Sequence, residues 1–323
     1  MDIDFSGRVA IVTGAGGGLG KVYATQLAAR GATVVVNDLG GGTEGTGGSS
    51  APADAVVSQI RNAGGIAIAH CESVASRHGG ESLVAAAMDH FGRVDVVINN
   101  AGNQRNNRFE LMTDEEFDSV LNVHLKGAFY VSQPAYRYMA QQHYGRFLFT
   151  SSSSAMLGHY IRTNYSSAKA GLVGMMHSVA LEGARHGILA NALLPVAASR
   201  LGKAPPGMLY PEWEAEQSVS GKPGFDLIGP SVVPEYVAPL ALYLCSERCT
   251  STRAMWSAVG RRYARVFVGV TKGWLAPAEQ PATPEEISEH LAQIEDRGGF
   301  DEPLSGMDEF NAVIELARQG AGR

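Results

Sequence analysis

The stretch from residue 150 to residue 169 carries the side chains with the clearest chemical use. Tyr165 and Lys169 are four residues apart, so on a helix they lie on one face. A neighbouring ammonium favours the ionised phenol and lowers its pKa from about 10. Such a tyrosine is a candidate general base, and Ser152, thirteen residues upstream, is a candidate to hydrogen-bond the oxygen on which it acts. The alternative is a half-buried tyrosine beside a solvated lysine.

A glycine-rich turn joins the first expected strand to the first expected helix. The apolar run 8–13 is followed by TGAGGGLG, from Thr13 to Gly20, and then by a helical pattern over 21–30. Glycines let the backbone approach a phosphate, and a helix N-terminus offers N–H donors and a positive dipole to an anion. With a second strand at 33–36 this forms a right-handed βαβ unit. The context predicts a nucleotide site.

Asp38 ends that second strand, 18 residues after Gly20. An acid there binds the adenosine ribose hydroxyls and repels a 2′-phosphate, and no Arg or Lys follows before Arg61. The prediction is NAD rather than NADP, and the alternative is an aspartate that only caps the turn. The Gly/Ser-rich loop at 39–50 is read equally as a flexible linker or as a flap that faces the ligand.

The rest of the chain alternates strands and helices. Further strands are expected at 66–69, 94–98, 146–150, 189–194 and either 256–259 or 266–270, and helices at 53–63, 81–91, 114–143 (with a kink or break), 164–185, 234–246, 284–295 and 307–318. This alternation predicts an α/β fold with a doubly wound parallel sheet of the Rossmann type. We expect one domain over 1–260, with an irregular substrate lid at 196–231. A C-terminal helical extension at 261–323 is expected to pack on the same domain.

Two asparagine motifs fall within this frame. NNAG at 99–102 follows a buried strand and is either a ligand contact or a structural turn. Asn122, in NVHLKG, is expected inside a helix, where an amide finds a partner or distorts the helix locally.

Composition narrows the function classes. The net charge is −6 and no basic face or tail predicts contact with nucleic acid or an anionic membrane. The apolar runs are far shorter than the ~20 residues of a membrane span. We expect no signal peptide, because the acidic N-terminus leads at once into a strand, and no peroxisomal tripeptide at the Gly-Ala-Gly-Arg end. Three cysteines, at 71, 245 and 249, suit a reducing cytoplasm. Cys245 and Cys249 are read as plain thiols near a helix end rather than half a metal site.

As a set, TGAGGGLG, the acid after the second strand, NNAG, NVHLKG, Ser152 and YSSAK resemble the short-chain dehydrogenase/reductase family. The resemblance implies a catalytic tetrad of Asn122, Ser152, Tyr165 and Lys169. Tyr165 would be the acid/base, Ser152 would orient the substrate oxygen, and Asn122 would hold a water in the proton relay. Lys169 would hold the nicotinamide ribose and lower the tyrosine pKa. It further implies cofactor contacts from Gly14, Gly18, Leu19, Gly20, Asp38, Ser73, Val74, Asn100, Ala101, Gly102, Tyr165, Lys169 and Pro195.

A narrower resemblance rests on NDLGG at 37–41, the Gly-rich loop, PEYVAPLALYLC at 234–245 and TPEEI at 283–287. These segments are similar to the (3R)-hydroxyacyl-CoA dehydrogenase units of type 2 multifunctional enzymes, a subgroup that includes 17β-hydroxysteroid dehydrogenase type 4. The resemblance implies NAD-dependent oxidation of a (3R)-3-hydroxyacyl-CoA, with a fatty or sterol-derived acyl group, by a homodimer or homotetramer. Two segments depart from the subgroup, WSAVGRR at 256–262 and the region 196–230, and both border the expected substrate site.

The expected partner is therefore a small-molecule acyl-CoA or steroid substrate. Arg105, Arg108, Arg200 and Lys203 are candidates to bind CoA phosphates, with ordinary surface charges as the alternative. Other functions left open are a hydroxysteroid dehydrogenase acting on a free steroid, a 3-ketoacyl thioester reductase, and a non-catalytic nucleotide-sensing protein. Self-association is expected through the helices at 114–143 and 164–185. We also expect a stand-alone dehydrogenase.

Overall fold

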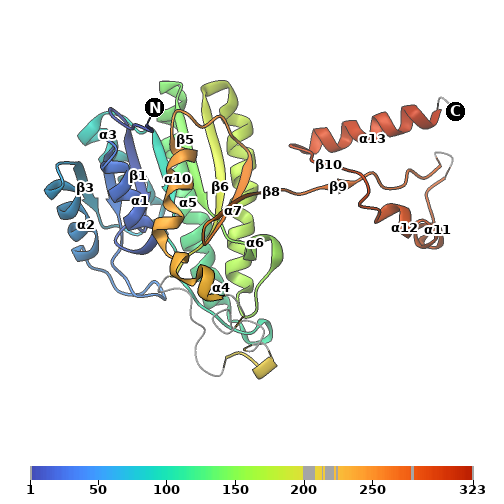
Figure 1. The fold of residues 1–323 in the computed structure, drawn as a ribbon, viewed down its shortest axis with the longest axis horizontal. Coiled ribbons are helices and arrows are strands. Elements are labelled where there is room, and N and C mark those ends of the chain that lie inside the picture. The colour runs from blue at the N-terminus through green and yellow to red at the C-terminus, as the bar shows by residue number, and fades with distance from the viewer. Residues whose placement is uncertain are drawn as a thin grey trace. The chain divides into compact units, whose positions relative to one another are not determined.

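The computed structural model describes residues 2–198, 208–212, 214, 222, 225–277 and 280–321. The chain divides into two compact units, Met1–Arg265 and Val266–Arg323 (Figure 1). This division falls close to the expected boundary at residue 260. The expected packing of the extension on the larger unit stays a prediction.

The larger unit is built on one sheet with the strand order β3-β2-β1-β4-β5-β6-β7-β8. The strands are β1 (Val9–Thr13), β2 (Thr33–Asn37), β3 (Ile66–His70), β4 (Val96–Asn99), β5 (Gly145–Thr150), β6 (Ile188–Val196), β7 (Ala254–Val259) and β8 (Arg262–Val266). Neighbours from β3 through β7 pair in parallel. The strand order reverses between β1 and β4, and in such sheets ligands bind beyond the carboxyl ends of the strands at that point. The predicted doubly wound fold is confirmed.

Helices cover both faces of the sheet (Figure 1). One layer holds α1 (Gly18–Ala28), α2 (Ala51–Asn62) and α10 (Ala238–Cys245), and the other holds α3 (Arg77–Phe91), α4 (Asp114–Leu121), α5 (Gly127–Gln142) and α7 (Thr163–Gly183). Shorter helical turns are Phe109–Leu111, α6 (Ser154–Leu157), Ala184–His186, α9 (Phe225–Ile228), Gly229–Ser231 and Pro234–Tyr236. Because both faces are covered, every residue of β1 is buried, as its continuous apolar run predicts.

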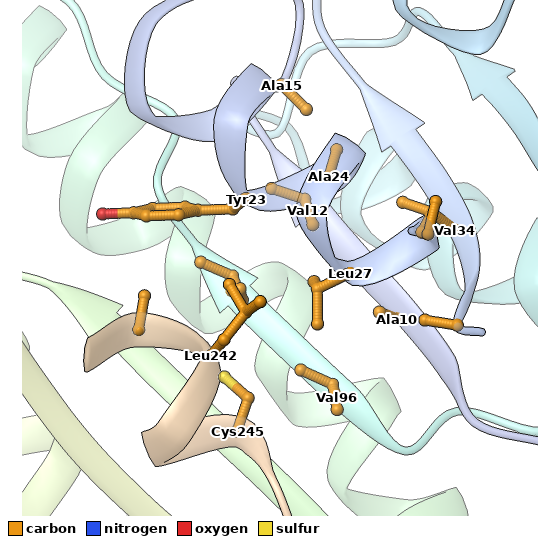
Figure 2. Close-up of a cluster of buried hydrophobic side chains, with 14 of the residues drawn as sticks. Ala10, Val12, Ala15, Tyr23, Ala24, Leu27, Val34, Val96, Leu242 and Cys245 are labelled. Atoms are coloured by element: carbon orange, nitrogen blue, oxygen red, sulfur yellow. The ribbon is translucent and has the colours of Figure 1, made fainter. Parts of the chain in front are cut away.

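The core between α1, α10 and the sheet is drawn in Figure 2. Leu27 and Tyr23 of α1 meet Leu242 and Cys245 of α10 over strands β1 and β4, and all four side chains are buried. This packing fixes α1 against the sheet. The N-terminus of α1 is thereby held over the end of β1, where the glycine-rich turn lies.

The long helix expected over 114–143 contains a break. α4 ends at Leu121, and the next turn, Asn122–Lys126, is a π-helix that closes with a hydrogen bond from the Gly127 N–H to the Asn122 carbonyl. α5 then continues to Gln142. The structure confirms the expected kink, and π-turns occur frequently at functional sites.

Two expected elements differ in detail. At the β7–β8 edge the sheet has two strands where one was expected. Gly260, with φ of +58°, allows the tight turn that joins them. In the smaller unit the helix expected at 284–295 is split into α11 (Pro284–Glu289) and α12 (Leu291–Ile294), and α13 runs over Gly306–Ala321. That unit also contains the antiparallel pair β9 (Val270–Thr271) and β10 (Phe300–Asp301).

No single helix in the described part of the chain is long and apolar enough to cross a membrane. Two helical stretches, Phe225–Ser231 and Pro234–Cys245, would have the length and apolar composition of a membrane span only if combined, and the chain bends by 85° between them. The three cysteines are free. Within the same described ranges no group of three metal-ligating side chains is gathered.

Candidate active site

A cavity of about 800 Å³ opens beyond the carboxyl ends of the central strands. The predicted site residues that line it are Gly14, Gly18, Leu19, Asp38, Ser73, Val74, Asn100, Ala101, Gly102, Asn122, Ser152, Tyr165, Lys169 and Pro195. The fold therefore brings together side chains that are separated by up to 181 positions in the sequence, from residue 14 to residue 195. Gly20 is the predicted contact that does not line the cavity.

Gly20 serves the packing beneath the turn. A Cβ atom at Gly20 would lie 2.3 Å from the Gly14 carbonyl oxygen and 2.6 Å from Nδ2 of Asn100. Gly14 itself has φ of +64°, and a Cβ there would lie 2.8 Å from Cα of Ala101. Gly20 thus has the close helix–strand packing role of the last glycine of such a turn, and its expected contact with the cofactor stays a prediction.

The N-terminus of α1 faces this turn without a side-chain cap. Gly17 occupies the N-cap position, and no side chain accepts a hydrogen bond there. Gly17 and Gly18 both line the cavity. A helix terminus of this kind has N–H groups and a partial positive charge available for a phosphate.

Asp38 both caps a turn and lines the cavity. Its carboxylate oxygens accept hydrogen bonds from the Gly16 N–H and the Gly40 N–H, each at 2.7 Å. The loop at 39–50 begins here, and its residues Leu39, Gly41, Gly42, Thr43 and Gly45 also line the cavity. The loop therefore fits a ligand-facing flap better than a mere linker.

The flap (residues 39–50) is tied to the segment that follows NNAG. The Gln104 N–H donates to the Thr43 carbonyl at 2.8 Å, and Nη1 of Arg105 lies 3.3 Å from a carboxylate oxygen of Glu44. Arg105, one of the expected CoA contacts, is thus paired with the flap. Arg108 contacts Glu110 at 3.5 Å and the Tyr210 hydroxyl. Arg200 and Lys203 lie outside the described residues.

NNAG holds the glycine-rich turn through Thr13, the first residue of TGAGGGLG, for which no separate role was predicted. Oγ1 of Thr13 accepts hydrogen bonds from the N–H groups of Asn100 and Ala101, at 2.9 and 3.0 Å. Nδ2 of Asn100 donates to the carbonyls of Thr13 and Gly14 at 3.0 and 3.1 Å. The sequence feature that could have pointed to this contact is a hydroxyl side chain, Thr13, at the end of a strand rich in β-branched residues. NNAG therefore supports the nucleotide turn as well as facing the cavity.

Lys169 is buried, with a relative exposure of 3%. Its ammonium Nζ donates to the Thr150 carbonyl at 2.5 Å and lies 5.5 Å from the centroid of the Tyr165 ring. Burial lowers the pKa of Lys169 to about 7. The alternative of a solvated lysine is excluded.

The pKa of Tyr165 is raised above its ordinary value of 10, and burial is the largest cause. A hydrogen bond with Ser152 and the charge of Arg162 act in the opposite direction. The predicted lowering of the tyrosine pKa by Lys169 is not found, because burial outweighs the two opposing causes and Lys169 is not one of them. The cation that acts on the phenol is Arg162, which also lines the cavity.

Ser152 is distinguished from its serine neighbours by its partners. Ser151 donates its hydroxyl to the Lys169 carbonyl at 2.8 Å, which fixes the strand end against α7. Ser152 bonds the Tyr165 hydroxyl, and its own Oγ accepts from the Ser154 N–H at 3.2 Å. The thirteen-residue spacing selects the serine that reaches the phenol.

Sequence reasoning assigned no role to two further side chains beside Tyr165. The His124 ring meets the Tyr165 ring edge-on, at 5.3 Å between centroids, and its Nε2 bonds the backbone of Asn103. Burial, and then the charge of Lys169, lower the pKa of His124 to about 3. Asn164 is fully buried, accepts from the Tyr165 N–H at 2.7 Å, and donates to the Arg105 carbonyl. The only sequence feature that pointed to His124 was its place in the NVHLKG motif.

Three features together define a dinucleotide-dependent oxidoreductase. They are the strand order of the sheet, the uncapped glycine-rich turn, and the serine, tyrosine and lysine that line the same cavity. The chain belongs to the short chain dehydrogenase family, whose pattern matches residues 8–199.

Two relatives in sequence resemble nearly the whole chain. The peroxisomal multifunctional enzyme type 2 of Mus musculus is 39% identical over 317 residues, which are 97% of this chain and 40% of the mouse protein. A short-chain type dehydrogenase/reductase of Mycobacterium tuberculosis is 40% identical over 296 residues, 90% of this chain and 95% of that protein. The chain thus spans less than half of the mouse relative and nearly all of the mycobacterial one.

Two solved structures have a similar fold. Full-length peroxisomal multifunctional enzyme type 2 from Drosophila melanogaster has a TM-score of 0.78 and 29% identity, over 98% of this chain and 50% of that one. A 7α-hydroxysteroid dehydrogenase in complex with NADH and 7-oxo glycochenodeoxycholic acid has a TM-score of 0.67 and 27% identity, over 80% and 94% of the two chains. Family and neighbour together indicate a nicotinamide cofactor.

Proposed function

We propose that this chain oxidises (3R)-3-hydroxyacyl-CoA thioesters to 3-ketoacyl-CoA with NAD as the electron acceptor, in a catabolism of the β-oxidation type. The observation that carries the proposal is the placement of Ser152, Tyr165, Lys169 and Asn122 on one cavity, beside a nucleotide turn. A hydroxyacyl-CoA dehydrogenase of Mycobacterium tuberculosis, 37% identical over 202 residues, supports the substrate class.

The residues of the cavity fit NAD. Gly14, Gly18 and Leu19 would face the pyrophosphate at the uncapped start of α1, and Asp38 would face the adenosine ribose. Ser73 and Val74 would flank the adenine. A carboxylate at position 38 supports NAD over NADP because it repels a 2′-phosphate. NAD, when bound, supplies the acceptor for the hydride that leaves C3 of the substrate.

Tyr165 accepts the proton of the substrate hydroxyl as it passes a proton on toward Lys169, since burial keeps the phenol itself protonated before the reaction. Ser152 orients the same substrate oxygen. The Ser152–Tyr165 hydrogen bond already sets these two groups against each other, so one substrate oxygen can contact both. As the carbonyl forms, the serine hydroxyl stabilises its oxygen by hydrogen bonding.

The proton taken by Tyr165 leaves toward Lys169 and Asn122 in this proposal. Lys169, with its pKa lowered to about 7, can exchange a proton near neutral pH. Asn122 lies in the π-turn that lines the cavity, where its amide would hold a water of the relay.

A substrate panel tests the function. We expect NADH formation with (3R)-3-hydroxyacyl-CoA to exceed NADPH formation from NADP by at least ~100-fold in kcat/KM, which is about the effect of one unfavourable charge contact. The (3S) isomer and free steroid alcohols should be poor substrates. If the protein instead prefers to reduce 3-ketoacyl thioesters with NADPH, its function is that of a 3-ketoacyl thioester reductase in a synthetic pathway.

The second candidate function is oxidation of a free hydroxysteroid. It is favoured by one observation, the similarity of fold and sequence to the 7α-hydroxysteroid dehydrogenase with its bound 7-oxo steroid. A kcat/KM for a free steroid alcohol above that for every hydroxyacyl-CoA in the panel would establish it in place of the thioester activity. A cytoplasmic location and a homodimeric or homotetrameric state are further parts of the proposal.

A further inference from the structure

Arg162 occupies an unusual turn at the start of α7. It is the N-cap residue, three positions before Tyr165, and its carbonyl accepts from the Ser166 N–H at 2.8 Å. The preceding residue, Ile161, has φ of +58° and a relative exposure of 5%. A β-branched residue in the left-handed region is strained, and such strain persists where the surroundings enforce it. Here the Asn107 N–H holds the Ile161 carbonyl at 3.0 Å.

The strained turn separates two neighbouring side chains. Ile161 is buried in the protein, whereas Arg162 lines the cavity together with Ser152 and Tyr165. Burial lowers the pKa of Arg162, and the Tyr165 phenol is the electrostatic partner that raises it. Because the guanidinium is a very strong base, the side chain keeps its charge near neutral pH even with this lowering of its pKa.

Charge is unevenly distributed along the cavity. Among its described lining residues the carboxylates are Asp38 and Glu72, which follow β2 and β3 at the adenosine end. The cations are Arg162 and Lys169, at the end that holds Tyr165. Lys169 donates to the Thr150 carbonyl, whereas Arg162 lines the cavity with Tyr165 and acts electrostatically on its phenol. An electron-rich substrate group next to the alcohol fits this end.

We propose that Arg162 is a substrate-binding residue that hydrogen-bonds the C1 carbonyl oxygen of a 3-hydroxyacyl group while the C3 hydroxyl lies against Tyr165 and Ser152. This inference rests on the proposed function and deepens it, because it names the part of the substrate that is recognised beside the reacting carbon. A hydroxyl at C3 and a carbonyl at C1 are separated by one carbon, so both oxygens can face side chains three residues apart. A guanidinium has five N–H donors, and one of them suffices for the C1 oxygen of substrate and product.

A matched pair of substrates isolates this contact. The first is (3R)-3-hydroxybutyryl-CoA, and the second is the thioether analogue in which a CH₂ group replaces the C1 carbonyl and the CoA is unchanged. Arg162 also acts on the Tyr165 pKa, and that effect reduces both rates equally. The ratio of the two kcat/KM values therefore reports only the carbonyl contact.

We expect Arg162→Met to lower the thioester-to-thioether ratio by about 10- to 100-fold, the range of one hydrogen bond to a charged group. Arg162→Lys should give an intermediate ratio. Arg77→Met, which removes a half-exposed cation from α3, should leave the ratio unchanged. Circular dichroism and NAD affinity serve to show that each variant is folded.

A binding measurement accompanies the kinetics. In a Tyr165→Phe background, Arg162→Met should weaken the binding of acetoacetyl-CoA by about 10-fold or more, and leave binding of the thioether unchanged. An unchanged ratio with both rates reduced in parallel would overturn the inference and leave the proposed function standing. Failure of the wild-type protein to oxidise any hydroxyacyl-CoA would instead overturn the proposed function, and the inference with it.

Discussion

At the scale of single residues, one buried corner moves two titratable groups toward their neutral forms. Burial lowers the pKa of Lys169 and raises that of Tyr165. The YxxxK spacing predicts which groups meet, but burial decides the direction of each pKa, and the charge of Arg162, outside the motif, only opposes it at Tyr165. Spacing alone cannot report on solvent access, so the direction is accessible only from the fold.

His124 gives a pH-dependent prediction at this scale. Its folded-state pKa of about 3 lies below its ordinary value of 6.5, so the unfolded chain binds the proton and the folded chain resists it. The stability associated with neutral His124 is therefore fully present above pH 6.5 and is lost as the pH falls toward 3. We expect His124→Asn to reduce the acid slope of the unfolding free energy by up to about 1.4 kcal/mol per pH unit.

The measurement is urea unfolding at a series of pH values from 7 down to 4, in steps of about half a unit. His78→Asn serves as the control, because its side chain is 83% exposed. A slope in His124→Asn equal to that of the wild-type protein would show that His124 does not resist protonation in the folded state.

At the scale of elements, the contact between α1 and β1 positions the nucleotide turn. A methyl group at Gly20 would meet the Gly14 carbonyl and the Asn100 amide, so α1 would have to move away from the sheet. We expect Gly20→Ala to weaken NAD binding by about 10-fold or more and to cost ~1–3 kcal/mol of stability, as overpacking does. Gly174→Ala in α7 is the control, because a methyl group there would have no atom within 4 Å beyond the adjoining backbone of its own helix. The NAD dissociation constant of each variant is measured by fluorescence titration. Equal constants for the two variants would contradict this role of Gly20.

The sequence predicts most elements here, and the exceptions have physical causes. Apolar runs predict the strands because a doubly covered parallel sheet requires them. The break at Asn122 was expected from an amide in mid-helix, but its form as a π-turn packed against α7 is seen only in the fold. The contact of Thr13 with Asn100 and the position of Arg162 beside Tyr165 were not predicted, because the turns that bring these residues together leave no trace in the periodicity of the sequence.

At the scale of the whole molecule, the chain combines a dehydrogenase-type sheet domain with a smaller C-terminal unit. It spans 40% of the mouse multifunctional enzyme but 95% of the mycobacterial dehydrogenase, so sequence similarity extends across proteins of different length. The site lies wholly within residues 14–197 of the larger unit. The chemistry proposed here is therefore a property of that unit, with self-association through α4, α5 and α7 as an expectation.

The most direct test of the central claim is the rate of NADH formation from (3R)-3-hydroxybutyryl-CoA by the wild-type protein and by Tyr165→Phe. Phenylalanine keeps the ring that packs edge-on against His124 and removes only the hydroxyl bonded to Ser152. We predict that kcat falls by about 10²- to 10⁴-fold, the contribution of a positioned general base, with NAD affinity unchanged. A Tyr165→Phe enzyme that retains wild-type kcat would contradict the account.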